Sequence, residues 1–267
     1  MAQGKIKVWR TVKRGFLFPI NQPGAILKLL AVPLAVWLLF SLAVALAFLG
    51  KEGTGRQTVQ FLVILVGFLC FIPAMVRCYR MILLREPPGF LSLGDFFGRP
   101  VLATLGMYLA LTLLAVVLCV PVTIGAGVAL AALGVKKEFA LLFIAFMALV
   151  STLLLLCLTP RLLLLFPNIA VGSPLRFREV TRLSKGNRLR IVWTIALLTL
   201  PLGIADAVAR TGIHEGSALN FLPVIYLTAS ALFSAAVQIH ALADIYRELL
   251  IMEKRRRDAA AGTTALV

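Results

Sequence analysis

Residues Ser173–Arg190 read SPLRFREVTRLSKGNRLR and form a short basic segment between two long apolar runs. Ser173 suits the N-cap of a helix, and Pro174 suits its first turn. Gly186 suits the position just past the last turn, where the backbone often turns left-handed. These three residues predict a helix over about 174–185.

The two faces of this predicted helix differ in polarity. The apolar face holds Phe177, Val180 and Leu183. The opposite face holds Arg178, Arg182 and Lys185. The pattern is typical of a helix that lies in a membrane interface, so the three cations are candidates for contact with anionic lipid headgroups.

The composition of the whole chain places it in a membrane. The 267 residues are 61% hydrophobic and 14% charged, whereas soluble domains are about half apolar and a quarter charged. The net charge of +16 is confined to short segments between apolar runs. Because those segments would face headgroups rather than line a continuous groove, we expect no nucleic-acid partner.

Six apolar runs are long enough to cross a bilayer, which takes about 20 helical residues. They cover approximately residues 25–49, 58–84, 101–135, 139–166, 190–209 and 216–250. The third run exceeds a perpendicular span, so we expect it to tilt, kink at Pro121 or continue beyond the bilayer. The sequence thus predicts one all-α membrane domain over residues 1–252, followed by a basic, disordered tail over 253–267.

The distribution of cations predicts the orientation. All but five of the 27 Lys and Arg residues lie in the N-terminal segment, the second and fourth connections and the C-terminal tail, or in the adjoining ends of the apolar runs. The five exceptions are Lys51, Arg56, Lys136, Lys137 and Arg210. By the positive-inside rule, both termini are expected on the cytoplasmic side.

An internal repeat is also visible. Amphipathic lead-in segments over about residues 5–16, 90–98 and 174–185 each precede a pair of runs. The second and sixth runs end alike, in CYRMIL (78–83) and IYRELL (245–250). We therefore expect three units, each a lead-in helix followed by a transmembrane hairpin.

With the lead-in sequence PLRFREVTRLSKGNRLRI (174–191) and the Y-R-x-x-L ending of the last run, the chain resembles a group of bacterial inner-membrane proteins. The group includes the YciC-type proteins and the membrane domain fused to some glycerophosphodiester phosphodiesterases. The resemblance implies a six-span fold in the bacterial inner membrane. It brings no catalytic residues, because the chain has no soluble stretch long enough for the phosphodiesterase domain.

Several ionisable residues lie in or beside the apolar runs, where charges usually have a partner or a task. They are Arg77, Arg80, Arg161, Asp206, His240, Asp244 and Arg247. One interpretation makes the first three a cradle for a lipid phosphate, with Asp244 as counter-ion. The alternative is interfacial anchoring with structural pairs at helical spacing: His240–Asp244, Asp244–Arg247 and Asp206–Arg210.

The sequence contains no nucleophile–base pair, no metal-ligand spacing and no C-x-x-C motif among its four cysteines. We therefore expect no enzyme activity, metal or cofactor. The favoured function is a non-enzymatic accessory or envelope-maintenance role, through anionic phospholipid headgroups, a membrane protein partner or a second copy. The alternative is a small transporter or lipid translocator with a site among the intramembrane Arg and Asp residues, since every predicted span contains or adjoins a proline.

Overall fold

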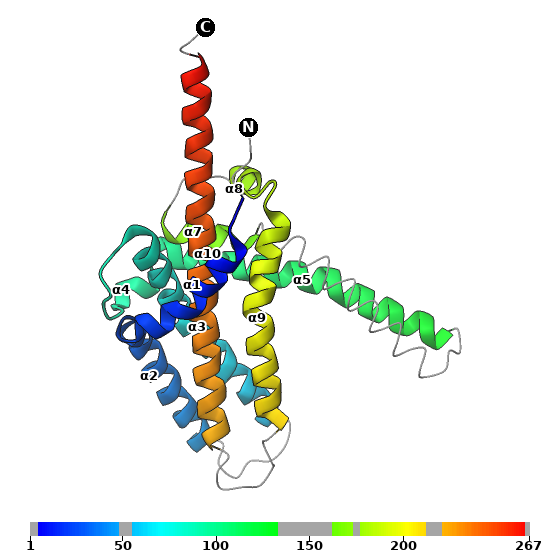
Figure 1. The fold of residues 1–267 in the computed structure, drawn as a ribbon. Helices are drawn as coiled ribbons and strands as arrows, with labels where there is room; N and C mark the ends of the chain where they lie inside the picture. Colours follow the sequence, from blue (N-terminus) through cyan, green and yellow to red (C-terminus); the bar gives the residue numbers. More distant parts are fainter. Residues whose placement is uncertain (1–4, 48–54, 133–161, 173–176, 212–220, 265–267) are drawn as a thin grey trace.

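The computed structural model describes residues 5–47, 55–132, 162–172, 177–211 and 221–264, all as helices, turns and short connections without a strand (Figure 1). The helices are α1 (Val8–Asn21), α2 (Pro23–Ala47), α3 (Gly55–Leu84), α4 (Leu93–Phe96), α5 (Arg99–Ala132), α7 (Leu165–Ala170), α8 (Phe177–Leu183), α9 (Arg188–Thr211) and α10 (Phe221–Thr264). The expected all-α architecture is therefore confirmed for the described residues.

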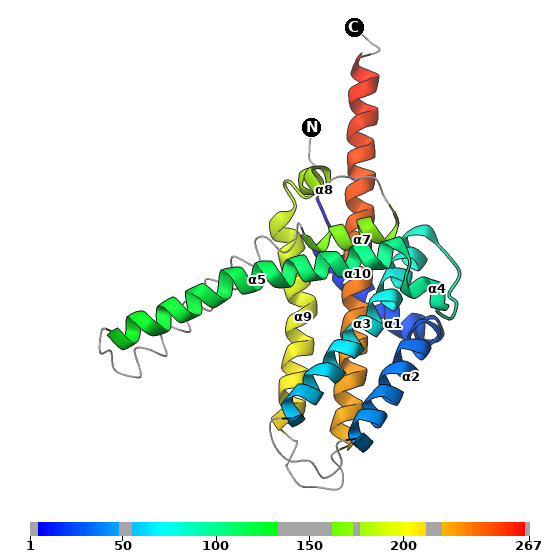
Figure 2. The same cartoon turned by 180° about the vertical axis from the view of Figure 1, so that it is seen from behind.

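The body of the molecule is a bundle in which α2 packs on α3, and α10 packs on both α3 and α9 (Figures 1 and 2). Within the described residues, four helical segments are long and apolar enough to cross a membrane: Pro23–Val44, Leu65–Leu84, Gly94–Leu114 and Arg188–Ala205. They coincide with four of the six predicted spans. The predicted span 139–166 lies mostly outside the described residues, and the predicted span 216–250 falls in α10, so the count of six stays a prediction.

Helix α1 lies across α9 and α10 instead of running parallel to them (Figure 1). Its inner face is buried, and Val12 packs with Leu198 and Val237 in a small apolar cluster. Gly15 permits the close approach, because a Cβ atom there would lie 3.3 Å from the carbonyl oxygen of Val237. The first predicted lead-in helix, 5–16, is thus a helix that begins at Val8 and extends to Asn21.

The predicted lead-in segment 90–98 forms much less helix. Only the single turn α4 is present, with a capping box at its N-terminal end. There the backbone N–H and the hydroxyl of Ser92 both donate to Oδ2 of Asp95. Helix α5 starts at Arg99, and Pro100 in its first turn suits that start. The three lead-in segments are therefore unequal in the structure.

Helix α5 covers most of the long third apolar run, 101–135. It is continuous over 34 residues, about 51 Å, and leaves the bundle at a steep angle to α3 and α9 (Figures 1 and 2). The helix continues through position 121, so the expected kink at Pro121 does not break it. Helix α5 is thus unbroken, and its tilt in a bilayer or continuation beyond it stays a prediction.

The start of α1 and the end of α10 lie at the same end of the bundle (Figure 1). Helix α10 runs on to Thr264, into the stretch 253–267 for which composition predicts disorder. An ion pair one helical turn apart, Arg257 Nε to Glu253 Oε1 at 3.3 Å, supports the helix there. Residues 253–264 are thus helical in this structure.

Candidate functional site

The segment 173–190 folds as its pattern predicts over the part that the structure describes. In α8, Val180 is fully buried and Leu183 is half-buried against the bundle. The α8 cations, Arg178 and Arg182 in the helix and Lys185 two residues after it, are exposed. Gly186 follows the helix with φ of +87°, a backbone conformation that side chains disfavour. This turn leads directly into α9. The predicted cap Ser173 lies outside the described residues.

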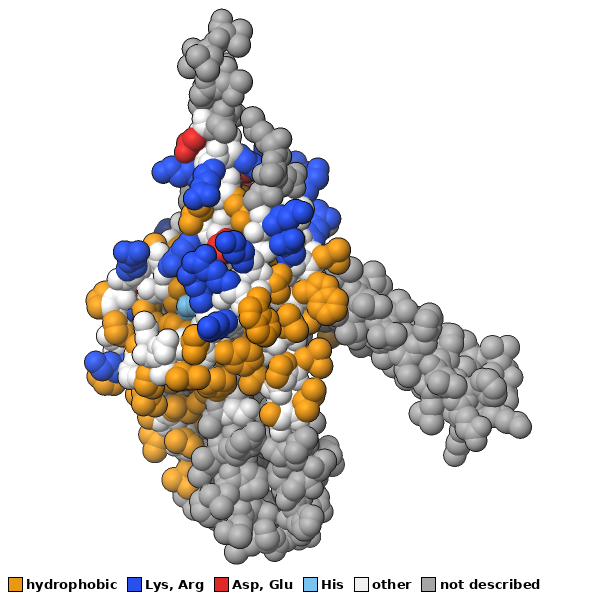
Figure 3. Space-filling view, in the orientation of Figure 1, with side chains coloured by type: hydrophobic (Ala, Val, Ile, Leu, Met, Phe, Trp, Pro, Cys, Tyr) orange, Lys and Arg blue, Asp and Glu red, His pale blue; other side chains and the backbone are white. Residues whose placement is uncertain are grey.

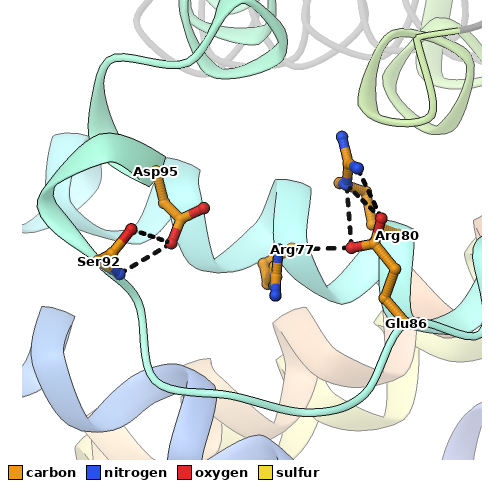
Figure 4. Close-up of polar contacts among 5 residues, drawn as sticks. All are labelled: Arg77, Arg80, Glu86, Ser92 and Asp95. Carbon is orange, nitrogen blue, oxygen red and sulfur yellow. Dashed lines mark hydrogen bonds and ion pairs between the residues drawn. The ribbon is translucent and has the colours of Figure 1, made fainter.

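The arginine pair at the end of α3 has a carboxylate partner. Arg80 donates to both carboxylate oxygens of Glu86, with its Nη2 2.6 Å from Oε1 and its Nε 3.1 Å from Oε2 (Figure 4). Arg77 Nη1 lies 3.4 Å from Oε2 of the same group. The hydrogen bond from Arg80 is the main cause that holds the pKa of Glu86 below its ordinary value.

A backbone turn places Glu86 beneath the two arginines. Helix α3 ends at Leu84, and Arg85 adopts the left-handed conformation with φ of +59°. The chain therefore turns back at Arg85, and the side chain of the next residue, Glu86, points toward α3. Sequence reasoning missed Glu86, although an acid six residues after Arg80 and directly after Arg85 is a signal that could have indicated it.

Asp244 has a different partner from the ones predicted. Its carboxylate is buried and lies 3.4 Å from Nη1 of Arg14, which comes from α1. Arg247 instead donates to the carbonyl oxygen of Ile82 on α3. The structure thus gives Asp244 a long-range partner, Arg14, and gives the α3 arginines a nearer acid, Glu86. The predicted cradle also includes Arg161, which lies outside the described residues, so the cradle stays a prediction.

His240 packs against an aromatic ring. Its imidazole stacks on Phe18 of α1, with ring centroids 4.5 Å apart. Among the described residues, His240 Nδ1 is buried without a hydrogen-bond partner. Arg161 and the side chain of Asp206 lie outside the described residues, so their predicted contacts are not described.

A cavity of about 640 Å³ lies between α2, α3 and α10, with Tyr108 of α5 and Phe166 of α7 at its margin. Its wall is almost entirely apolar, and neither the α3 arginines nor Asp244 line it. Ala231 and Ala235 of α10 form part of the wall and are exposed. The volume falls within the range of about 300–1,000 Å³ that small-molecule pockets occupy.

The surface divides into two zones (Figure 3). Lys and Arg side chains gather around the end that holds α8, the start of α1 and the upper part of α10, and apolar side chains cover the adjoining part of the bundle. This arrangement matches a protein seated in a bilayer with one basic face at the headgroups. Within the described residues, no three His, Cys, Asp or Glu side chains come together as a metal site would require.

Comparisons of the chain with models of protein families, with curated proteins and with solved structures give no match.

Proposed function

We propose that the protein is a non-enzymatic, polytopic membrane protein that acts by binding anionic phospholipid headgroups on its basic face. The observation that carries the proposal is that α8 has one buried apolar face and one exposed basic face. Val180 is buried against the bundle, whereas Arg178, Arg182 and Lys185 are exposed. Cations so placed contribute about 1 kcal/mol each to attraction toward an anionic leaflet.

The cations on the α3 end support this role less directly. Arg77 and Arg80 share Glu86, so one of their two positive charges is already offset within the protein. The α8 cations show no such ion pair among the described residues. We therefore place the headgroup contact at α8 and treat the Arg77–Arg80–Glu86 cluster as a structural tie.

Native mass spectrometry of the detergent-extracted protein tests the proposal. Replacement of all three α8 cations by glutamine should reduce the number of retained anionic phospholipids. A matched variant with Arg178→Lys and Arg182→Lys keeps the charge and should retain the wild-type lipid profile. The same profile in the glutamine variant as in the wild type would contradict the proposal.

A second candidate, a lipid translocator, is favoured by the apolar cavity. A cavity of this size between α2, α3 and α10 could admit an acyl chain, whereas a transporter of polar solutes needs polar groups at the membrane midplane. Ala235→Phe would fill part of the space. If the protein scrambles lipids, proteoliposomes with this variant should scramble a fluorescent lipid more slowly than those with Ala235→Ser. If lipid scrambling is as slow in proteoliposomes with the wild-type protein as in protein-free vesicles, the translocator is excluded.

A further inference from the structure

An open groove of about 870 Å³ lies between α1 and the first turns of α9, and Arg178, Arg182 and Lys185 do not line it. Its two walls come from segments some 180 residues apart in the chain. They are joined by hydrogen bonds: Arg190 Nη1 donates to the carbonyl oxygen of Ile6 at 2.8 Å, and the Ile6 N–H donates to Asn187 Oδ1 at 3.1 Å. The groove is therefore a product of the tertiary fold.

The groove carries four cations. Lys7, Arg10 and Lys13 are exposed along the α1 wall, and Arg190 is half-buried in the α9 wall. None of the residues that line the groove is acidic. Glu248 on α10 lies near Arg10 and offsets part of its charge. The net balance still favours an anion over a zwitterion.

Two tryptophans lie in the same groove and are largely uncovered. Trp9 is 73% exposed and Trp193 is 61% exposed. Indole rings prefer the headgroup level of a bilayer, where their apolar body and their N–H group are both satisfied. Their presence beside four cations places the groove at the depth of the phosphate and glycerol groups.

Below the tryptophans, α9 presents an apolar face. Leu197, Leu200 and Ile204 are exposed in succession along it. Ile204 is 14 residues from Arg190, a rise of about 21 Å along the helix axis. The sequence of cation, indole and aliphatic side chain thus follows the order of phosphate, glycerol and acyl chain in a phospholipid.

We propose that this groove binds one anionic phospholipid from the adjoining leaflet. Its phosphate lies among Arg10, Lys13 and Arg190, its glycerol region between Trp9 and Trp193, and one acyl chain along α9. The proposal builds on the proposed function, because both place the basic face at headgroups. It adds a defined site with its own residues, which the α8 variants leave unchanged.

Tryptophan quenching tests the site directly, because the chain has three tryptophans and Trp37 lies elsewhere, in the apolar cavity. A Trp37→Phe protein in vesicles reports on Trp9 and Trp193 alone. We expect brominated phosphatidylglycerol to quench this fluorescence more strongly than brominated phosphatidylcholine at the same mole fraction. Arg10→Gln with Lys13→Gln should lower the preference for the anionic lipid by about tenfold.

Two control variants separate this site from general surface charge. Arg10→Lys with Lys13→Arg keeps both charges and should keep the preference for the anionic lipid. Loss of this preference in the charge-conserving variant would overturn the proposal. Arg178→Gln with Arg182→Gln should leave the quenching unchanged. An equal loss in that α8 variant would also overturn the proposal, because the effect would then be diffuse. If the α8 variant retains less lipid but both brominated lipids quench the Trp37→Phe protein equally, the groove site is refuted and the proposed function is not.

Discussion

Asn187 Oδ1 accepts a hydrogen bond from the backbone N–H of Ile6 at 3.1 Å, and both residues are buried. The contact ties the start of the chain to the turn between α8 and α9. Ile6 also packs with Val180 and Ile191 in the core beneath that turn. The N-terminal segment and the 173–190 segment, each predicted as a separate lead-in element, therefore form one unit of structure.

Asn187→Ala should destabilise this unit. The Ile6 N–H would lose its acceptor while buried, at a cost of about 1–3 kcal/mol. We expect a lower Tm for the protein in detergent and faster proteolytic removal of the N-terminal segment. Asn187→Asp keeps an acceptor oxygen and should recover most of the loss; an unchanged Tm for the alanine variant would show that the hydrogen bond contributes nothing.

The Arg14–Asp244 pair joins α1 to α10, with the carboxylate buried and the arginine half-exposed. Arg14→Gln would leave the buried carboxylate without its cation, so we expect a loss of roughly 1–3 kcal/mol, less than for a fully buried pair. Addition of Asp244→Asn should restore part of it. Denaturation of the two single variants and the double variant measures the coupling, and strictly additive effects would argue against the pair.

Local patterns in the sequence predicted the local structure well. The opposite faces of α8, the left-handed turn at Gly186 and four apolar helices all follow from spacing and hydropathy. Such features depend on residues within one or two turns of one another. The steep path of α5 and the crossing of α1 over the bundle depend on packing between distant segments, and no local pattern encodes them.

The candidate site shows the same division. The exposed cations of α8 were predictable, because burial of Val180 determines which way they face. The partner of Asp244 was not, because Arg14 lies 230 residues away and several arginines were nearer along the chain. The α1–α9 groove likewise required the fold, since Trp9 and Trp193 carry no signal in the sequence that they share a surface.

Gly15 provides a test of the close packing of α1. A Cβ atom at this position would lie 3.3 Å from Leu198 Cδ2 and 3.3 Å from the Val237 carbonyl oxygen. Gly15→Val should therefore displace α1 and destabilise the protein by about 1–3 kcal/mol. Gly24→Ala in α2 is the control, because nothing lies within 4 Å of its added Cβ atom. Equal Tm values for Gly15→Val and the wild type would show that α1 is loosely packed.

The Glu86 carboxylate predicts a dependence of stability on pH. Its pKa in the folded protein lies below its ordinary value, chiefly because Arg80 donates a hydrogen bond to it and secondarily because Arg77 and Arg80 are cationic. A group whose folded pKa is depressed stabilises the fold above its unfolded pKa, and that contribution is lost as the pH falls through the folded pKa. The loss should begin near pH 4.5, the ordinary value for this carboxyl.

Glu86→Gln removes this titration while it keeps the shape of the side chain. We expect the variant to have a lower Tm than the wild type at pH 7, because the amide accepts weaker hydrogen bonds from Arg80 than the carboxylate does. The difference should narrow between pH 5 and pH 3 as the wild-type carboxylate becomes protonated. Thermal unfolding in detergent across this range measures it. A difference in Tm that stays constant over the whole range would mean that the ionised form of Glu86 does not stabilise the end of α3.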